Sequence, residues 1–219
     1  MIARLNVGGP SIQAITLTRT LEPFGYETVL VRGTEGELEG SMDDLAGSLG
    51  VTALHVPSLR RDPGWHDLRA LVALIAIMRR ERPRIVHTHA AKAGALGRLA
   101  AIAAGWGRVD KPIVVHTFHG HSLTGYFSTR RSAIYRRIEQ LLARRTDKLV
   151  AVSTEVRDEL VALGVASAER FEVLPLGFDL TGFTRDPEGR SAAAQKVRSE
   201  LGIPADATVV TVVARLVAI

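Results

Sequence analysis

The 219-residue chain contains no cysteine, so it can form neither disulfide bonds nor thiolate metal sites, and packing alone must hold its fold. It also lacks a long apolar run, because its longest, residues 71–78, is far below the roughly 20 residues of a membrane-spanning helix. No signal-peptide pattern opens the sequence. These absences predict a cytoplasmic protein, either free or peripheral on the inner face of the plasma membrane.

Several catalytic motifs are missing as well. The sequence has neither the Walker pattern Gly-x-x-x-x-Gly-Lys-Ser/Thr nor the dinucleotide pattern Gly-x-Gly-x-x-Gly, which argues against a P-loop enzyme and a dinucleotide dehydrogenase. The Gly-x-Ser-x-Gly elbow of Ser-His-Asp hydrolases is absent too, and Ser153 is better explained as a helix cap.

The positive charge is concentrated in one segment. Residues 128–148 contain seven basic and two acidic residues, an excess of +5 that equals the net charge of the whole chain. Apolar residues recur there at helical spacing, which predicts an amphipathic helix with an apolar inner face and a basic outer face. These apolar residues are Ala133, Ile134, Ile138, Leu141 and Leu142.

Two interpretations of that basic helix, residues 130–148, stay open. Its outer face is either simply solvated or docks on an anionic membrane surface. Nucleic acid is not expected as a partner, since no aromatic platform, zinc-ligand spacing or recognition-helix motif accompanies the charge.

Apolar β-branched runs alternate with helical patterns along the chain, which predicts an α/β fold with a doubly wound, mostly parallel sheet. The expected strands are residues 2–5, 28–31, 53–56, 85–88, 113–117, 148–152 and 171–174. The expected helices are residues 11–24, 42–49, 65–82, 93–104, 130–145, 154–163 and 192–201.

Five of the seven histidines lie in two groups, each where a predicted strand ends: His87 and His89, then His116, His119 and His121. In such sheets ligands bind beyond the carboxyl ends of the strands, where the loop at residues 6–10 also falls. Imidazole suits proton transfer near neutral pH. A catalytic metal is not expected, because neither histidine group contains an acidic residue. Isolated His55 and His66 are more simply explained as satisfied polar residues.

Five motifs resemble the amino-terminal domain of family 4 glycosyltransferases of the GT-B fold, and their order along the chain agrees. They are Ala3-Arg4-Leu5-Asn6-Val7-Gly8-Gly9-Pro10, His87-Thr88-His89-Ala90-Ala91-Lys92-Ala93-Gly94-Ala95-Leu96-Gly97-Arg98, His116-Thr117-Phe118-His119-Gly120-His121, Val150-Ala151-Val152-Ser153-Thr154-Glu155 and Val173-Leu174-Pro175-Leu176-Gly177-Phe178-Asp179. This resemblance implies a retaining transfer of sugar from a nucleotide sugar, such as a UDP-sugar, to a saccharide or lipid-linked acceptor. It implies no metal or other cofactor, and a role in bacterial envelope or exopolysaccharide synthesis.

The resemblance also implies roles for individual residues. His119 is expected to be the catalytic histidine that contacts the transferred sugar and the reacting oxygen. Donor contacts fall to Gly8, Gly9 and Arg215. Acceptor contacts fall to His89, Lys92 and His121. His87 and His116 are expected to point away from the ligand, as core or supporting residues.

The same family pattern predicts the domains. Residues 1–180 are expected to form the acceptor-binding domain, residues 181–207 a linker with a short helix, and residues 208–219 the first strand of an incomplete nucleotide-sugar-binding domain. The chain thus resembles a fragment truncated at both ends, and little transferase activity is expected from it alone. Two alternatives remain, a nucleotide-sugar 2-epimerase of the same fold and a non-catalytic binding module.

Overall fold

The computed structural model describes residues 1–36, 39–120, 129–178, 180 and 187–212. The chain divides into two compact units, Met1–Gly177 and Phe178–Ile219, and each is described by itself.

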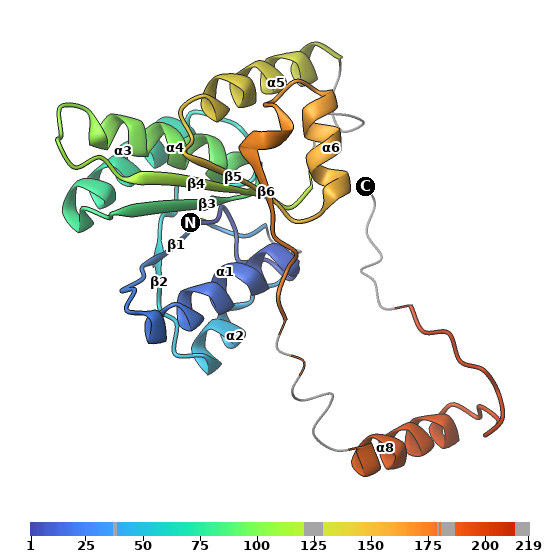
Figure 1. Cartoon of the computed structure of the whole chain (residues 1–219). Coiled ribbons are helices and arrows are strands. Elements are labelled where there is room, and N and C mark those ends of the chain that lie inside the picture. The colour runs from blue at the N-terminus through green and yellow to red at the C-terminus, as the bar shows by residue number, and fades with distance from the viewer. Residues whose placement is uncertain (37–38, 121–128, 179, 181–186, 213–219) are drawn as a thin grey trace. The chain divides into compact units, whose positions relative to one another are not determined.

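A parallel sheet forms the centre of the first unit (Figure 1). Parallel pairing joins β1 to β2 and runs from β3 through β4 and β5 to β6. Ile2 forms parallel bridges to Arg32 of β1 and to His89 of β3, so the two groups of strands meet at this residue. The strands are β1 (Leu30–Arg32), β2 (Ala53–His55), β3 (Ile85–His89), β4 (Ile113–Phe118), β5 (Lys148–Ala151) and β6 (Phe171–Val173). The predicted parallel α/β fold is confirmed.

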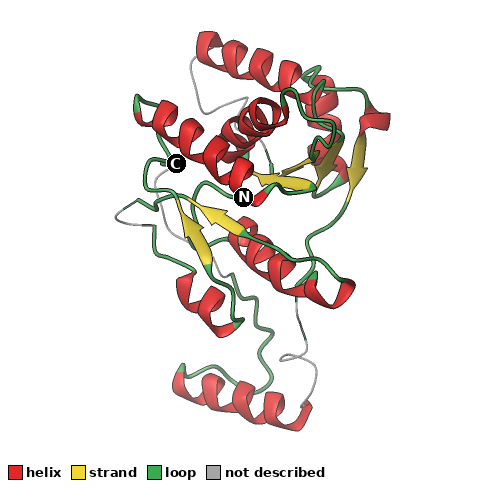
Figure 2. Ribbon diagram, turned by 90° about the vertical axis from the view of Figure 1, so that its left-hand side faces the viewer, coloured by secondary structure: helices red, strands yellow, loops and turns green. Residues whose placement is uncertain are grey.

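Helices lie on both sides of these strands (Figures 1 and 2). Three buried apolar clusters join them to the sheet, one with α1 and α2, one with α3 and α4, and one with α5 and α6. The helices are α1 (Gly9–Thr20), α2 (Asp43–Ser48), α3 (His66–Glu81), α4 (Ala91–Gly105), α5 (Thr129–Ala143) and α6 (Thr154–Ala162). Short 3-10 helices lie after α1 at Glu22–Phe24 and after α6 at Ala168–Arg170. The predicted cap is present, since the hydroxyl of Ser153 accepts a hydrogen bond from the amide of Val156.

The first predicted strand, residues 2–5, is reduced to the bridges at Ile2. The backbone of Leu5 is bonded elsewhere: its amide donates to Glu35 Oε1 at 2.7 Å, and its carbonyl accepts from the amide of Met42 at 2.7 Å. Loop residues therefore take the backbone groups that a longer strand would have paired.

Two glycines let α4 lie close against the sheet. A Cβ atom at Gly94 would come within 2.3 Å of His116 Cε1, and one at Gly97 within 2.7 Å of Thr88 Cγ2. Any larger residue at these positions would displace the helix from β3 and β4. Gly94 and Gly97, both in the motif from His87 to Arg98, thus have a packing role.

A buried ion pair fixes α5 against α4. The Arg98 guanidinium donates to both carboxylate oxygens of Glu139, at 2.9 and 2.7 Å, and its Nε donates to the Gly94 carbonyl at 2.8 Å. Arg98 is 1% and Glu139 6% exposed. Such a pair sets orientation more than it adds stability.

The predicted inner face of α5 is wrong for most of its apolar residues. Glu139, Leu142 and Ala143 are the buried residues of this segment, whereas Ile134, Ile138 and Leu141 are exposed together with the arginines. Because Glu139 points inward to Arg98, the helix is rotated so that these aliphatic side chains face outward.

The second unit contains one described helix, α8 (Pro187–Glu200). The Arg198 guanidinium closes the turn after it by donating to the carbonyls of Pro204 and Ala207. Residues 208–212 carry no strand, and 213–219 lie outside the described residues, so the predicted strand and domain boundaries stay predictions. Among the described residues, no helix is long and apolar enough to cross a membrane.

Candidate active site

The histidine motifs come together at the carboxyl edge of the sheet. His89 is the last residue of β3, and His119 directly follows β4, which pairs in parallel with β3. Because neighbouring parallel strands end at the same edge, the two side chains meet there. His89 Nδ1 lies 3.1 Å from His119 Nε2, and the two ring centroids are 5.4 Å apart.

One nitrogen of His119 is left for a ligand. Its Nε2 is occupied by His89, whereas its Nδ1 is buried and has no hydrogen-bond partner within the described part of the chain. A neutral imidazole can present this atom either as an N–H donor or as a lone-pair acceptor, depending on which ring carries the shared proton. The pair thus leaves one buried polar atom without a partner among the described residues, and a hydroxyl or an oxyanion would satisfy it.

His87 lies on the same side of β3 as His89, so the prediction that it points away is wrong. The two ring centroids are 4.2 Å apart, and His87 Nε2 lies 2.7 Å from the Thr117 hydroxyl oxygen. Residues two apart on a strand share one face, which accounts for the contact. The His87 ring therefore packs against the His89 ring on the same face of β3.

His116 belongs to the core, as predicted. It is fully buried on the opposite face of β4, where its Nδ1 lies 2.8 Å from the Thr88 hydroxyl oxygen and its ring meets Phe118 edge to face at 4.3 Å. It contacts the helix layer through Gly94.

Burial keeps the four histidines in β3, in β4 and directly after β4, called the histidine cluster, uncharged at neutral pH. It lowers the pKa of His119 to about 4, and burial together with the N-terminal ammonium and His119 lowers the pKa of His87 to about 4. The pKa of His89 lies well below its usual range because of burial and then His87, and that of His116 because of burial and then Arg98. Neutral rings can exchange protons with a bound hydroxyl, whereas an imidazolium could only donate.

Acidification from about pH 7 to pH 5 should lower the free energy of unfolding of the chain. In this window the unfolded histidines take up protons near their ordinary pKa of about 6.5, while those of the folded cluster stay neutral, so the unfolded state binds more protons. Each such group contributes up to about 1.4 kcal/mol per pH unit. The measurement is urea unfolding at several pH values. The variant His116→Gln should flatten the profile, the matched variant His55→Gln should not, and a constant free energy across the window would contradict the expectation.

Lys92 lies in the first turn of α4, but its ammonium group is turned toward the start of α3. It forms an ion pair with Asp67 Oδ1 at 2.7 Å and donates to the Asp62 carbonyl. Its predicted acceptor contact would require this pair to open or the acceptor to reach the pair. The role stays a prediction.

Ala90, between His89 and α4, has a strained backbone. Its φ of 62° and ψ of 167° fall in a region that is open essentially to glycine. Such a conformation costs on the order of 1–3 kcal/mol and persists only where the surroundings impose it. The strain lies next to His89, on the edge that holds the candidate site.

The loop with Gly8 and Gly9 leads into α1. Among the described residues, a methyl group at Gly8 would contact only Pro10, and one at Gly9 would meet Leu176 at 3.4 Å, so these residues leave room for a ligand to approach the backbone of the loop. This geometry does not test the predicted donor contact of Gly8 and Gly9, which stays a prediction.

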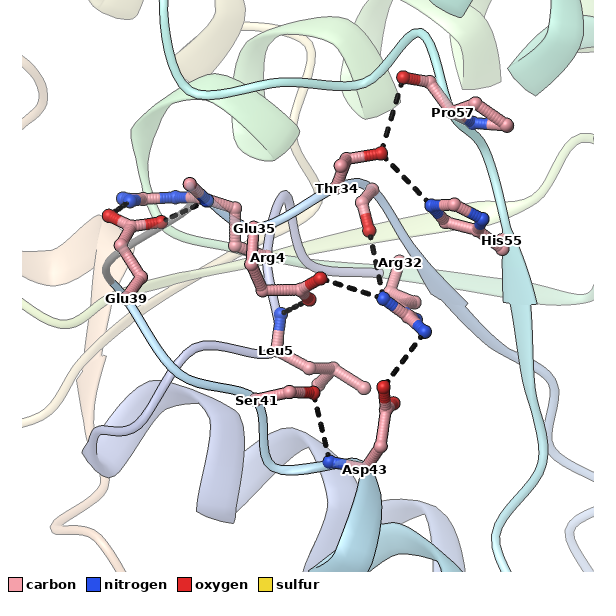
Figure 3. A network of polar contacts seen from close by, with 12 residues as sticks. Arg4, Leu5, Arg32, Thr34, Glu35, Glu39, Ser41, Asp43, His55 and Pro57 are labelled. Atoms are coloured by element: carbon pink, nitrogen blue, oxygen red, sulfur yellow. Dashed lines mark hydrogen bonds and ion pairs between the residues drawn. The ribbon is translucent and has the colours of Figure 1, made fainter.

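A network of charged residues that sequence reasoning missed ties this loop to the one after β1 (Figure 3). Glu35 accepts from the Leu5 amide and from Arg32 at 2.8 Å, and Arg32 also reaches Asp43 at 3.1 Å. Glu39 pairs with Arg4. Burial raises the pKa of Glu39, but hydrogen bonds from the Gly36 amide and Arg4 together lower it by more, so the net pKa shift is downward. In the sequence, the repeated glutamates between β1 and α2 were the signal that could have predicted this network.

The remaining predicted site residues, His121 and Arg215, lie outside the described residues. His55 bonds to Thr34, and His66 to the Asp62 carbonyl, as expected for satisfied polar residues. The hollows of about 490 and 450 Å³ that meet at Trp106 lie at the amino edge of the sheet, away from His119. The described part of the chain contains no group of three ligating side chains that could hold a metal ion.

The sequence profile described as Glycosyltransferase Family 4 matches residues 7–181, most of the chain. The chain belongs to glycosyltransferase family 4. A UDP-Gal:alpha-D-GlcNAc-diphosphoundecaprenol alpha-1,3-galactosyltransferase of Escherichia coli is 30% identical over 195 residues, which cover 87% of this chain and 46% of that protein. This family 4 glycosyltransferase chain spans about half the length of the curated relatives it matches.

Solved structures agree in fold with this family 4 chain. Anabaena HepE, crystallised with UDP and glucose, has a TM-score of 0.59 at 21% identity over 92% of this chain and 50% of its own. A UDP-N-acetylglucosamine 2-epimerase has a TM-score of 0.55 at 15% identity over 78% of this chain and 46% of its own. This family 4 chain thus shares its architecture with an epimerase, so the function must be argued from the site.

Proposed function

We propose that the chain is the acceptor-side half of a retaining glycosyltransferase that uses a UDP-sugar. The observation that carries the proposal is His119, whose Nδ1 is buried and unpaired among the described residues at the carboxyl edge while His89 holds its Nε2. In the reaction the bond from the anomeric carbon to the diphosphate breaks and UDP leaves with the electron pair, the acceptor oxygen forms the new bond to the anomeric carbon, and the proton of the acceptor hydroxyl is released with UDP. His119 supplies a neutral imidazole at the reacting centre.

The proposed acceptor is a saccharide or a lipid-linked saccharide of envelope or exopolysaccharide synthesis. The Escherichia coli relative, whose name specifies a diphosphoundecaprenol-linked acceptor, supports this class. UDP as the nucleotide of the donor is supported by the name of the Escherichia coli relative and by the UDP bound to the Anabaena neighbour. A cytoplasmic location, where nucleotide sugars are made available, belongs to the same proposal.

We further propose that transfer needs no metal. The amino-terminal turns of α1 and α4 lie at the carboxyl edge of the sheet, where their backbone amides and helix dipoles favour negative charge. Arg215 is proposed as a basic side chain that contacts the donor.

The test supplies a complete protein that carries this chain with UDP-sugars, a diphosphoundecaprenol-linked saccharide and a chelator. UDP release should depend on the acceptor, persist with the chelator and give a product with the donor's anomeric configuration, which NMR reads directly. Conversion of the UDP-sugar to its 2-epimer without acceptor would instead establish the epimerase alternative. The 219-residue chain alone should show little turnover, and rapid transfer by it would contradict the half-site assignment.

A further inference from the structure

The outer face of α5 carries an apolar stripe. Ile134, Ile138 and Leu141 are 59%, 37% and 61% exposed, and their spacing of four and three residues places them along one side of the helix. Glu139 and Leu142, which are buried, lie on the adjoining side of the helix, next to Ile138. The exposed stripe is thus a consequence of the inward ion pair and not of a missing core.

Exposed arginines flank the stripe along its length. At 100° per residue, Arg130 and Arg137 fall on one side and Arg131 on the other, while Arg144 and Arg145 extend the surface past the end of the helix. None of these five arginines has an acidic partner in the part of the chain that the structure describes. The only acidic residue in 129–146 is Glu139, which is neutralised inside by Arg98. The face therefore combines aliphatic side chains with unopposed positive charge.

This combination fits the headgroup region of an anionic bilayer. Interfacial helices insert a narrow aliphatic face to the depth of the acyl boundary while basic side chains reach lipid phosphates. A protein partner fits less well, since one stripe of three side chains supplies only part of the roughly 800 Å² per partner that a stable interface buries. Nucleic acid would use the charge but not the aliphatic stripe.

We propose that the α5 face, defined by Ile134, Ile138, Leu141 and the five flanking arginines, docks the protein on membranes that contain anionic phospholipid. Since α5 connects β4 to β5, it runs antiparallel to the strands, and its first turn lies at the carboxyl edge that holds His119. A bilayer on this face lies alongside the candidate site, within reach of a lipid-linked acceptor. The docking itself does not require transfer activity.

The test is flotation of the chain with vesicles of phosphatidylcholine alone or with about one third phosphatidylglycerol. The wild-type chain should float only with anionic vesicles, and less at high salt. The double variants Ile134→Ser/Leu141→Ser and Arg130→Gln/Arg137→Gln should each weaken binding about tenfold or more. All four positions are exposed, so folding should be retained, which circular dichroism checks.

The matched control is Arg69→Gln/Arg79→Gln on α3, which removes the same charge from exposed positions elsewhere. It should bind within about twofold of wild type. Absent wild-type binding, equal binding to neutral vesicles, or an equal loss in the control would each overturn the proposal. So would a wild-type dimer that Ile134→Ser/Leu141→Ser converts to a monomer without loss of flotation, because the stripe would then serve a second copy of the chain.

Discussion

Replacing His119 with alanine should lower the turnover number of the complete transferase by about 10² to 10⁴. The variant removes the imidazole whose Nδ1 is buried and unpaired in the described structure, and with it the proposed contact to the reacting hydroxyl. KM should change much less than kcat, because the contact is expected to strengthen at the transition state. Steady-state kinetics measures both. His55→Ala, at the end of β2 where the ring bonds to Thr34 and not to the other histidines, is the control and should be near wild type, whereas near-normal turnover in His119→Ala would refute the catalytic role.

Variants of His89 separate positioning from catalysis. His89 is 2% exposed and contacts His119 through Nδ1, so it holds the proposed catalytic ring and leaves little of itself for an acceptor. His89→Asn keeps a polar atom near the Nδ1 position and should retain much more kcat than His89→Leu. Equal loss in both variants would show that this contact does not position His119.

Replacing Glu139 with alanine should lower the free energy of unfolding by about 3–5 kcal/mol. The substitution leaves the Arg98 guanidinium, 1% exposed, without its carboxylate, and a buried unpaired charge is strongly destabilising. Urea unfolding of wild type and variant at neutral pH measures the difference.

Two further variants test this explanation. The double variant Arg98→Met/Glu139→Leu should recover most of the lost stability, because apolar side chains of similar volume replace a buried pair at little cost. Glu172→Ala should change stability by less than about 1 kcal/mol, since its contact with Lys148 is 3.9 Å long and exposed. If Glu139→Ala costs no more than Glu172→Ala, the unpaired Arg98 charge does not destabilise the fold as expected.

The strands and helices that surround the histidines could be predicted closely from sequence. The β-branched runs before His89 and His119 gave β3 and β4 to within one residue, and helical periodicity gave α3 to within one residue at each end. Such local patterns depend only on neighbouring residues. The meeting of His89 with His119 also followed, because it requires only that adjacent parallel strands end together.

Contacts between distant residues explain what sequence could not provide. Ile134, Ile138 and Leu141 were predicted to face the core, but Glu139 is turned inward by Arg98, which lies 41 positions earlier. The Glu35 bond to Leu5 likewise crosses 30 positions and ended the first strand early. The side of His87 was predictable, since a period of two already places it with His89.

The glycine contacts of α4 have a consequence for reactivity. With Gly94 against His116 and Gly97 against Thr88, the helix cannot slide without steric overlap or lift without leaving a void, so β3, β4 and α4 form a closely packed frame behind His89 and His119. A closely packed frame keeps the imidazole dipoles aligned before substrate arrives, which reduces the reorganisation energy of the chemical step. Changes in acceptor preference should therefore arise in the surrounding loops, while the histidine pair and its frame stay fixed.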